Sequence, residues 1–189
     1  LQKFSLWLQQ LWSESLGKAQ NASGELVNSG PTVLMAQGAR DQHSQLQLFA
    51  EGPENKVILF LTLKNHDADI KIPVETLEPS LFQSLSERGV GELLNLEHQA
   101  TVESLRRKSR PTMTLELEKL DEEAVGELLM MFMISTVYAG DLYGVNALGQ
   151  PGVELGKRLT FELLDREETD HSDISKRDSR WRIGNVSGN

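Results

Sequence analysis

The sequence has 189 residues, of which 39% are hydrophobic and 25% are charged, and its formal net charge is −9. This length suits one domain with a hydrophobic core, and the acidic balance argues against a general nucleic-acid-binding protein. Because the sequence contains no cysteine, it excludes disulfide bonds, thiolate chemistry and zinc–thiolate sites. These properties are typical of a soluble, cytoplasmic globular protein, and no pair of histidines has the spacing of a metal site.

The amino-terminal segment has the pattern of an amphipathic helix. Apolar residues recur at helical spacing as far as about Leu16, and Gly17 then ends the helix. The apolar positions are Leu1, Phe4, Leu8 and Leu11. No secretory signal is recognisable there, and the lack of an initial methionine suggests a fragment of a longer protein.

Three apolar runs predict the main strands of a parallel sheet. Residues 31–36 and 57–63 are almost continuously apolar, which is typical of strands that are covered on both faces. Residues 111–117 alternate between apolar and polar side chains. Residues 70–73 are expected to form a short edge strand, and the polar residues 21–30 a loop.

Helices are expected between and after these strands. Asp41 is a suitable cap for a helix over residues 42–50, which Gly52 would end. The helix from Asp121 through Tyr138 has the composition of a buried core helix, and its strongly apolar stretch is shorter than a membrane span. The remaining predicted helices cover residues 80–88, 91–107 and 151–165.

The alternation of strands and helices predicts a three-layer α/β/α fold with a mostly parallel sheet. We expect one domain over residues 1–164, which ends in carboxyl-terminal helices. The polar residues 165–189 are expected to form a mobile tail, because they lack apolar periodicity.

The stretch from Gln150 to Lys157 combines helix signals with an unusual charge placement. Pro151 suits the first position of a helix, and Gln150 the capping position before it. Gly156 inside a helix costs about 1 kcal/mol relative to alanine, which indicates a close approach of another backbone. Lys157 lies about two turns beyond Gln150, on nearly the same side of the helix axis. Two interpretations stay open: a surface lysine whose stem lies along apolar neighbours, or an ammonium group at the wall of a polar site.

Several motifs resemble those of glucose-6-phosphate isomerases, also called phosphoglucose isomerases. The matching positions are Asn146, residues 150–154 and Lys157 for a signature near the carboxyl end, and residues 38–48 and 50–53 for the bacterial branch. Leu148 and Gly149 depart from the Phe-Asp that members usually have there. The resemblance extends from residue 1 to about residue 164. It implies the carboxyl-terminal part of a sugar-isomerase (SIS) domain, followed by helices.

The resemblance implies a cofactor-free aldose–ketose isomerase. Such an enzyme interconverts glucose 6-phosphate and fructose 6-phosphate through an enediol or enediolate, serves glycolysis and gluconeogenesis, and forms a homodimer whose sites share residues across the interface. Members of the family are longer, and their first SIS domain, phosphate loop and enediolate-stabilising arginine precede the matching region. We therefore expect little isomerase activity from this chain alone.

The resemblance also implies roles for individual residues. Gln150 would contact the sugar phosphate, and Lys157 would help to open or orient the sugar ring. His66 lies near the position of a family histidine that helps in ring opening. Gln42 and His43 belong to the Asp-Gln-His motif and would contact or orient the substrate, with a structural role for His43 as an equal alternative.

Glu51 is the candidate for the base that moves a proton between C2 and C1 of the sugar. At the carboxyl end of a helix, the negative end of the helix dipole should raise the pKa of this carboxyl group, and a pKa near neutrality favours proton transfer. The alternative is an ordinary surface glutamate. Ala36 stands where the animal-type branch has its glutamate, so either Glu51 takes the role of base or the protein lacks that base.

A second class of function remains open. Ala36 and the missing amino-terminal half of the family also fit a non-catalytic SIS-type module that binds a sugar phosphate. A related possibility is the isomerase part of a fused, bifunctional protein. The presence of Gln150, Lys157 and Glu51 together favours descent from a working enzyme.

Overall fold

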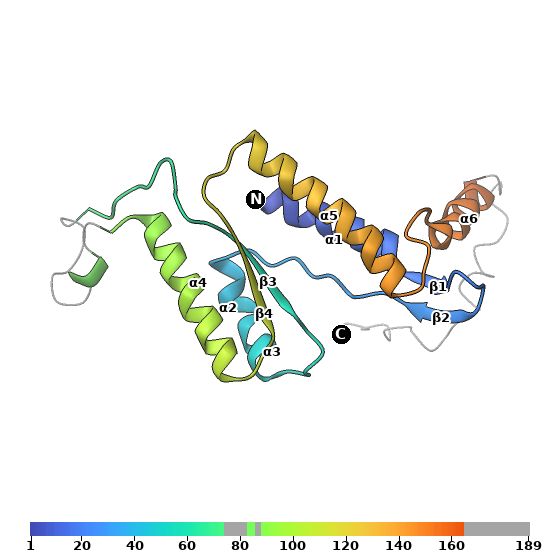
Figure 1. The fold of residues 1–189 in the computed structure, drawn as a ribbon, viewed down its shortest axis with the longest axis horizontal. Coiled ribbons are helices and arrows are strands. Elements are labelled where there is room, and N and C mark those ends of the chain that lie inside the picture. The colour runs from blue at the N-terminus through green and yellow to red at the C-terminus, as the bar shows by residue number, and fades with distance from the viewer. Residues whose placement is uncertain (74–82, 86–87, 165–189) are drawn as a thin grey trace, which may run out of the picture. The chain divides into compact units, whose positions relative to one another are not determined.

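The computed structural model describes residues 1–73, 83–85 and 88–164, and the chain divides into two units, Leu1–Leu148 and Gly149–Asn189. The first unit, drawn in Figure 1, contains α1 (Gln2–Leu16), β1 (Lys18–Gln20), β2 (Leu26–Ser29), α2 (Arg40–Ser44), α3 (Leu46–Glu51), β3 (Ile58–Leu63), the 3-10 helix η2 (Gln83–Leu85), α4 (Val90–Arg107), β4 (Thr112–Leu117) and α5 (Glu122–Leu142). The second unit contains the 3-10 helix η3 (Pro151–Val153) and α6 (Glu154–Leu164). The predicted tail over residues 165–189 lies outside the described residues.

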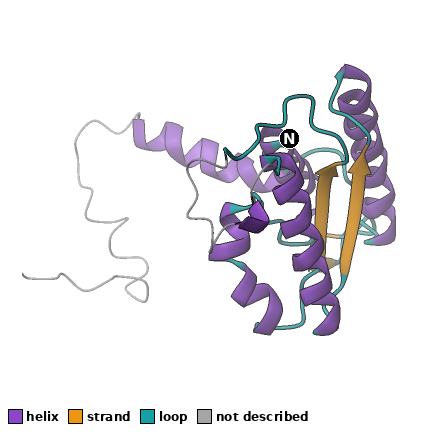
Figure 2. Cartoon of the chain, turned by 90° about the vertical axis from the view of Figure 1, so that its left-hand side faces the viewer, coloured by secondary structure: helices purple, strands orange, loops and turns teal. Residues whose placement is uncertain are grey.

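A parallel pair of strands forms one of the two described sheets of the first unit. β3 pairs with β4 in a regular register that runs from Ile58 opposite Thr112 to Leu63 opposite Leu117. Helices lie beside this pair in Figure 2. The predicted strands over residues 57–63 and 111–117 are therefore confirmed. The expectation that β3 is covered on both faces is wrong, because its side chains are half-buried and Leu59 is 37% exposed. Among the described strands β4 is its one hydrogen-bonded neighbour.

The segment from residue 31 to residue 36 does not form the predicted strand. It is extended, with half-buried and exposed side chains in strict alternation, and Leu34 is 62% exposed. A strand requires a hydrogen-bonded neighbour, and none of the described strands pairs with this segment. The predicted edge strand over residues 70–73 is likewise reduced to a single bridge between Lys71 and Gly89.

A β-hairpin replaces most of the loop that we expected before this segment. β1 and β2 pair antiparallel, and the Asn21 side chain closes the turn between them. Its Oδ1 accepts hydrogen bonds from the backbone N–H groups of Ser23 and Glu25, at 3.0 and 2.9 Å. Asparagine can satisfy the backbone of a turn in this way, so a polar composition did not exclude strand pairing on either side.

The predicted helix over residues 42–50 is split into α2 and α3. The break is at Gln45, whose backbone has φ −119° and ψ −16°. Asp41 does not cap this helix from outside but lies inside α2. Its carboxylate instead accepts a hydrogen bond from the N–H of Gln37 at 2.7 Å. Gly52 ends α3 as predicted.

The two long helices of the first unit are close to their predictions. α4 begins one residue before the predicted range and ends at Arg107 as expected. Asp121 caps α5, because its Oδ1 accepts the N–H of Ala124 at 2.9 Å. The predicted helix over residues 80–88 lies mostly outside the described residues, and its described part is η2.

α5 is buried along one stripe rather than all around, which corrects the expectation of a buried core helix. The buried positions recur every four residues and are Leu128, Phe132, Thr136 and Gly140. Phe132 packs against Phe4 of α1 with 5.7 Å between ring centroids. α5 also extends four residues beyond Tyr138, and over its 21 residues it has the length and apolar composition of a membrane-crossing helix. It is the one such helix in the described part of the chain.

Candidate functional site

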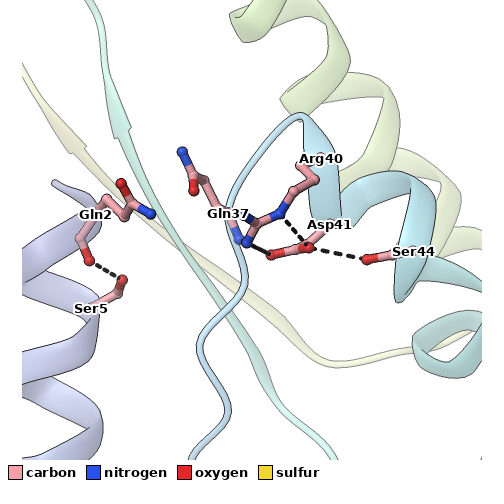
Figure 3. Close-up of polar contacts among 6 residues, drawn as sticks. All are labelled: Gln2, Ser5, Gln37, Arg40, Asp41 and Ser44. Carbon is pink, nitrogen blue, oxygen red and sulfur yellow. Dashed lines mark hydrogen bonds and ion pairs between the residues drawn. The ribbon is translucent and has the colours of Figure 1, made fainter.

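A turn between the extended segment and α2 places the Asp-Gln-His motif. Asp41 is 7% exposed, and its Oδ2 accepts the N–H of Gln37 at 2.7 Å while its own N–H donates to the Gln37 carbonyl at 2.7 Å. Both carboxylate oxygens also accept from the Arg40 guanidinium at 3.0 Å, and Oδ1 accepts from the Ser44 hydroxyl at 3.0 Å. These contacts, drawn in Figure 3, fix the backbone that carries the next two residues of the motif.

The Gln42 side chain points away from the solvent and towards α4. Its Nε2 donates to Thr101 Oγ1 at 2.8 Å, and that hydroxyl in turn donates to the Glu97 carbonyl at 2.8 Å. Its Oε1 is buried and has no hydrogen-bond partner among the described residues. Gly38 makes room for this arrangement, because a Cβ at that position would lie 3.1 Å from Gln42 Oε1.

His43 has a different environment from Gln42. It is exposed on α2, and it does not line the cavity that Gln42 faces. Neighbouring side chains of the motif therefore point to different surroundings, as adjacent positions on a helix do.

A cavity of about 480 Å³ lies between β3 and the helices that face it. Gln42, His66 and Ala36 line it together, and α4 contributes His98 and Thr101. The structure thus brings together three positions that the sequence had singled out for separate reasons. The lining contains the Asp41 carboxylate but neither a lysine nor an arginine among the described residues, so it lacks the cations that usually hold a phosphate group.

His66 is half-buried beside the first turn of α4. A Cβ at Gly91 would lie 2.5 Å from its Cδ2, so the ring packs directly on that glycine. Its Nε2 is buried and unpaired within the described part of the chain. An imidazole nitrogen in this state can still donate to or accept from a ligand hydroxyl.

His98 of α4 lies against both strands of the parallel pair. Its ring meets the edge of Phe60 with 4.9 Å between centroids, and its Nε2 lies 3.4 Å from Thr114 Oγ1. Burial lowers the pKa of this imidazole, with a smaller opposing effect from Glu116.

Glu51 lies at the carboxyl end of α3 as predicted, but its pKa is lowered rather than raised. Lys108 Nζ donates to Glu51 Oε1 at 2.6 Å, and the charge of the same lysine adds to this effect. Gln47 Nε2 donates to the other carboxylate oxygen at 3.2 Å. The ion pair with Lys108 lowers the pKa more than the negative end of the helix dipole raises it. The dipole is small here because α3 has only six residues. Glu51 is exposed and does not line the cavity.

Gln150 and Lys157 belong to the second unit. Gln150 precedes η3 with Pro151 at its first position, as predicted, but the glutamine side chain makes no capping hydrogen bond. The α-helix itself begins at Glu154. Lys157 is exposed, and its Nζ lies 2.7 Å from Glu154 Oε1. Apart from the helix's own backbone, no atom of the described residues lies within 4 Å of a Cβ built at Gly156, so within the described part of the chain no backbone approaches it closely.

Two features of the site escaped the sequence analysis. Asp41 was assigned to a helix cap, and neither His98 nor Thr101 was connected with Gln42. The spacing of His98 and Thr101 by three positions on a helix would have shown that they share a face with Leu94 and Leu105.

No cluster of three or more potential metal ligands occurs among residues 1–73, 83–85 and 88–164.

Comparison with known proteins identifies relatives along almost the whole sequence. The profile of the family described as phosphoglucose isomerase matches residues 1–181. A glucose-6-phosphate isomerase of Rubrobacter xylanophilus is 44% identical over 168 residues, which are 88% of this chain and 37% of that protein. A probable glucose-6-phosphate isomerase of Haloarcula marismortui is 39% identical over 184 residues, 97% of this chain and 40% of that protein. The chain thus spans about two fifths of the length of these relatives.

Solved structures agree with these matches. A hypothetical protein of Thermus thermophilus superposes with a TM-score of 0.80 at 37% identity, over 87% of this chain and 39% of that one. A glucose-6-phosphate isomerase of Chlamydia trachomatis shares the fold with a TM-score of 0.71 at 22% identity, over 86% of this chain and 32% of that one. Because the family profile matches residues 1–181, the chain belongs to the phosphoglucose isomerase family.

Proposed function

We propose that the full-length protein containing this chain is a glucose-6-phosphate isomerase. It would interconvert glucose 6-phosphate and fructose 6-phosphate through an enediol or enediolate, without a cofactor. The observation that carries this proposal is the match of the family profile over residues 1–181. The names of the relatives, at 44% and 39% identity, support the same activity.

This chain has candidates for three tasks in the proposed reaction: binding the phosphate group, opening or orienting the sugar, and moving a proton between C2 and C1. Gln150 would bind the sugar phosphate, since its amide group can donate hydrogen bonds to phosphate oxygens. Lys157 would bind or orient the open sugar chain through its ammonium group. Both residues are exposed and therefore accessible to substrate. In the first unit, Gln42 and His43, carried by a turn that is fixed through Asp41, would contact or orient a sugar phosphate.

Glu51 remains the candidate for the base, with an additional requirement. A base with a lowered pKa is ionised at neutral pH and can accept a proton, but its ion pair with Lys108 weakens it. In the proposed reaction Lys108 would therefore have to move away from Glu51 when the substrate binds. His66, half-buried with an unpaired Nε2 in the described part of the chain, would serve ring opening by donating to or accepting from a sugar hydroxyl.

The finer architecture is part of the proposal. The mixed α/β unit would belong to a three-layer SIS-type domain that comprises residues 1–164, with residues 165–189 as a separate tail. The exposed Leu34 and Leu59 support a larger sheet, because they leave apolar surface on the extended segment and on β3. The whole protein would act as a homodimer in the cytoplasm, in glycolysis and gluconeogenesis.

The test is isomerase turnover of the full-length protein on fructose 6-phosphate, with Glu51→Gln and Lys157→Ala variants. We expect each substitution to lower kcat by about 10²-fold or more, because Glu51→Gln removes the proton-transfer group and Lys157→Ala removes the group that orients the open sugar chain. Glu123→Gln and Arg158→Ala are matched controls, because both residues are exposed and lie outside the proposed site. The controls should keep wild-type kcat.

A second candidate is a non-catalytic module that binds a sugar phosphate. Ala36 and the ion pair of Glu51 with Lys108 favour it, since a missing or neutralised base suits binding without turnover. Full-length protein that binds fructose 6-phosphate but does not convert it would establish this alternative and refute the isomerase proposal. Activity that survives Glu51→Gln would instead retain the isomerase and assign its base elsewhere.

A further inference from the structure

The strongest unexplained feature of the first unit is the buried carboxylate of Asp41. It is 7% exposed, and its two oxygens receive hydrogen bonds from the Gln37 N–H, from the Arg40 guanidinium at two positions and from the Ser44 hydroxyl, all at 2.7 to 3.0 Å. Figure 3 shows the carboxylate at the centre of these partners. The carboxylate thus connects Gln37, at the end of the extended segment, with Arg40 and Ser44 at the two ends of α2.

α2 is too short to hold its own conformation. It has five residues, whereas isolated helices below about 12 to 15 residues are marginal in water. No side chain in the described part of the chain caps its first turn. Two hydrogen bonds join Gln37 and Asp41: the Asp41 N–H donates to the Gln37 carbonyl, and the Gln37 N–H donates to the Asp41 carboxylate. They hold the start of the helix in place of a side-chain cap.

The residues that follow Asp41 are the two site candidates of the motif. Gln42 is held on a second side by Thr101 of α4 at 2.8 Å. His43 is exposed, and the backbone of the turn sets the point on α2 from which its side chain projects. A shift of about 1 Å in a substrate-positioning group can cost on the order of 10²-fold in rate.

We propose that Asp41 is a positioning residue of the isomerase: its carboxylate holds the turn from Gln37 to Ser44 so that His43 is presented to the sugar phosphate. This inference rests on the proposed function of the same site. Asp41 itself does not exchange protons with the substrate, because Arg40 and the Gln37 N–H keep its pKa far below the ordinary value and the group stays ionised.

The test is a double-mutant cycle in the full-length protein with Asp41→Ala, His43→Ala and both together. We measure kcat and KM for fructose 6-phosphate, the dissociation constant by calorimetry, and Tm. Asp41→Ala should lower kcat by about 10²-fold when His43 is present, and by less than about threefold when His43 is already absent. The lowering of Tm should be the same in both backgrounds.

Two further variants separate positioning from stability. Asp41→Asn keeps an oxygen for the Gln37 N–H and a polar contact with Ser44, so its kcat should stay within about tenfold of wild type. Asp121→Ala is the matched control, because Asp121 also accepts a backbone N–H at the start of a helix but lies outside the proposed site. It should lower Tm and leave kcat unchanged.

The outcomes distinguish this proposal from the proposed function. An equal loss of kcat on Asp41→Ala with and without His43 would overturn the positioning role and leave a structural one. If wild-type protein binds fructose 6-phosphate without turnover, the isomerase proposal fails. The cycle is then read from the dissociation constants, where non-additivity between Asp41 and His43 is still expected. Additive effects of the two substitutions on the free energy of binding, or no binding by the wild-type protein, would overturn the positioning role of Asp41.

Discussion

The packing of His66 on Gly91 leaves no room for a larger residue at that position of α4. A Cβ there would lie 2.5 Å from His66 Cδ2 and 2.6 Å from Cγ. We therefore expect Gly91→Ala to displace the imidazole and to lower the Tm of the full-length protein. Gly126 provides the control inside α5, since apart from the helix's own backbone no atom of the described residues lies within 4 Å of a Cβ at that position.

Gly126→Ala should raise the free energy of unfolding by about 0.5 to 1 kcal/mol, because alanine favours helix more than glycine does. Urea denaturation of both variants measures this difference. Equal stabilisation by the two substitutions would show that His66 is not packed against α4 in solution.

The ion pair between Lys108 and Glu51 makes a pH prediction for the proposed base. Lys108 lowers the pKa of Glu51, and a base acts only when it is deprotonated. Removing the lysine lets this pKa rise, so Lys108→Ala should move the acidic limb of kcat/KM to higher pH. Lys56→Ala removes the same charge from a lysine that bonds Asn55 instead, and should leave the limb in place. An unmoved limb in Lys108→Ala would exclude Glu51 as the base.

At the scale of elements, an aromatic pair joins α1 and α5. Phe132 is 6% exposed, and its ring packs on Phe4. Phe132→Ala should lower the free energy of unfolding by about 3 to 5 kcal/mol, the usual cost of emptying a large buried site. The neighbouring Met133 is 42% exposed, so Met133→Ala should cost less than about 1 kcal/mol.

Urea denaturation of the full-length protein compares the two variants. Similar small losses for Phe132→Ala and Met133→Ala would contradict the packing of α1 against α5. A large loss for both would instead mean that the exposed side of α5 is covered in the full-length protein.

At the scale of the whole molecule, carboxylates in ion pairs and hydrogen bonds should make the stability of the folded state depend on pH in the acidic range. The pKa values of Asp41, Glu51 and Asp121 are lowered, and hydrogen bonds from Arg106 and Arg107 lower the pKa of Glu103 to about 2. A carboxyl group with a lowered pKa stabilises the folded state above its unfolded pKa of about 4. That stabilisation is lost as the pH falls through the folded value.

We therefore expect the Tm of the full-length protein to be nearly constant from pH 7 to 5 and to fall between about pH 4.5 and 2. Glu103→Gln should remove part of this fall, whereas Glu123→Gln, at an exposed position, should not. Thermal melts across this pH range measure the effect. A Tm that does not change between pH 5 and pH 2 would contradict the role of these ion pairs.

The elements that the sequence predicted well are those that local chemistry specifies. α1 and α4 follow apolar periodicity, and the Asp121 cap begins α5 as expected. The apolar run of β3 also predicted a strand without help from distant residues. The site candidates Gln42, His43 and Glu51 were found because they belong to motifs that resemble a family, not because composition or spacing required them.

Other features depend on which distant groups meet. Residues 31–36 are almost continuously apolar, yet they form no strand, because backbone N–H and C=O groups need a neighbour that the sequence pattern does not reveal. The pKa of Glu51 falls instead of rising, because Lys108 lies 57 positions further along the chain and still reaches its carboxylate.

The sequence by itself determined the family, the mixed α/β class and the positions of the long helices and of both strands of the parallel pair. Periodicity and motif spacing are properties of neighbouring residues, so they can be read directly. Only the tertiary structure decided that Asp41 closes a turn, that Gln42 and His66 line one cavity, and that α5 buries a single stripe. The cavity and the buried stripe arise from packing between segments far apart in the chain, whereas the Asp41 turn arises from local side-chain hydrogen bonds that apolar periodicity does not reveal.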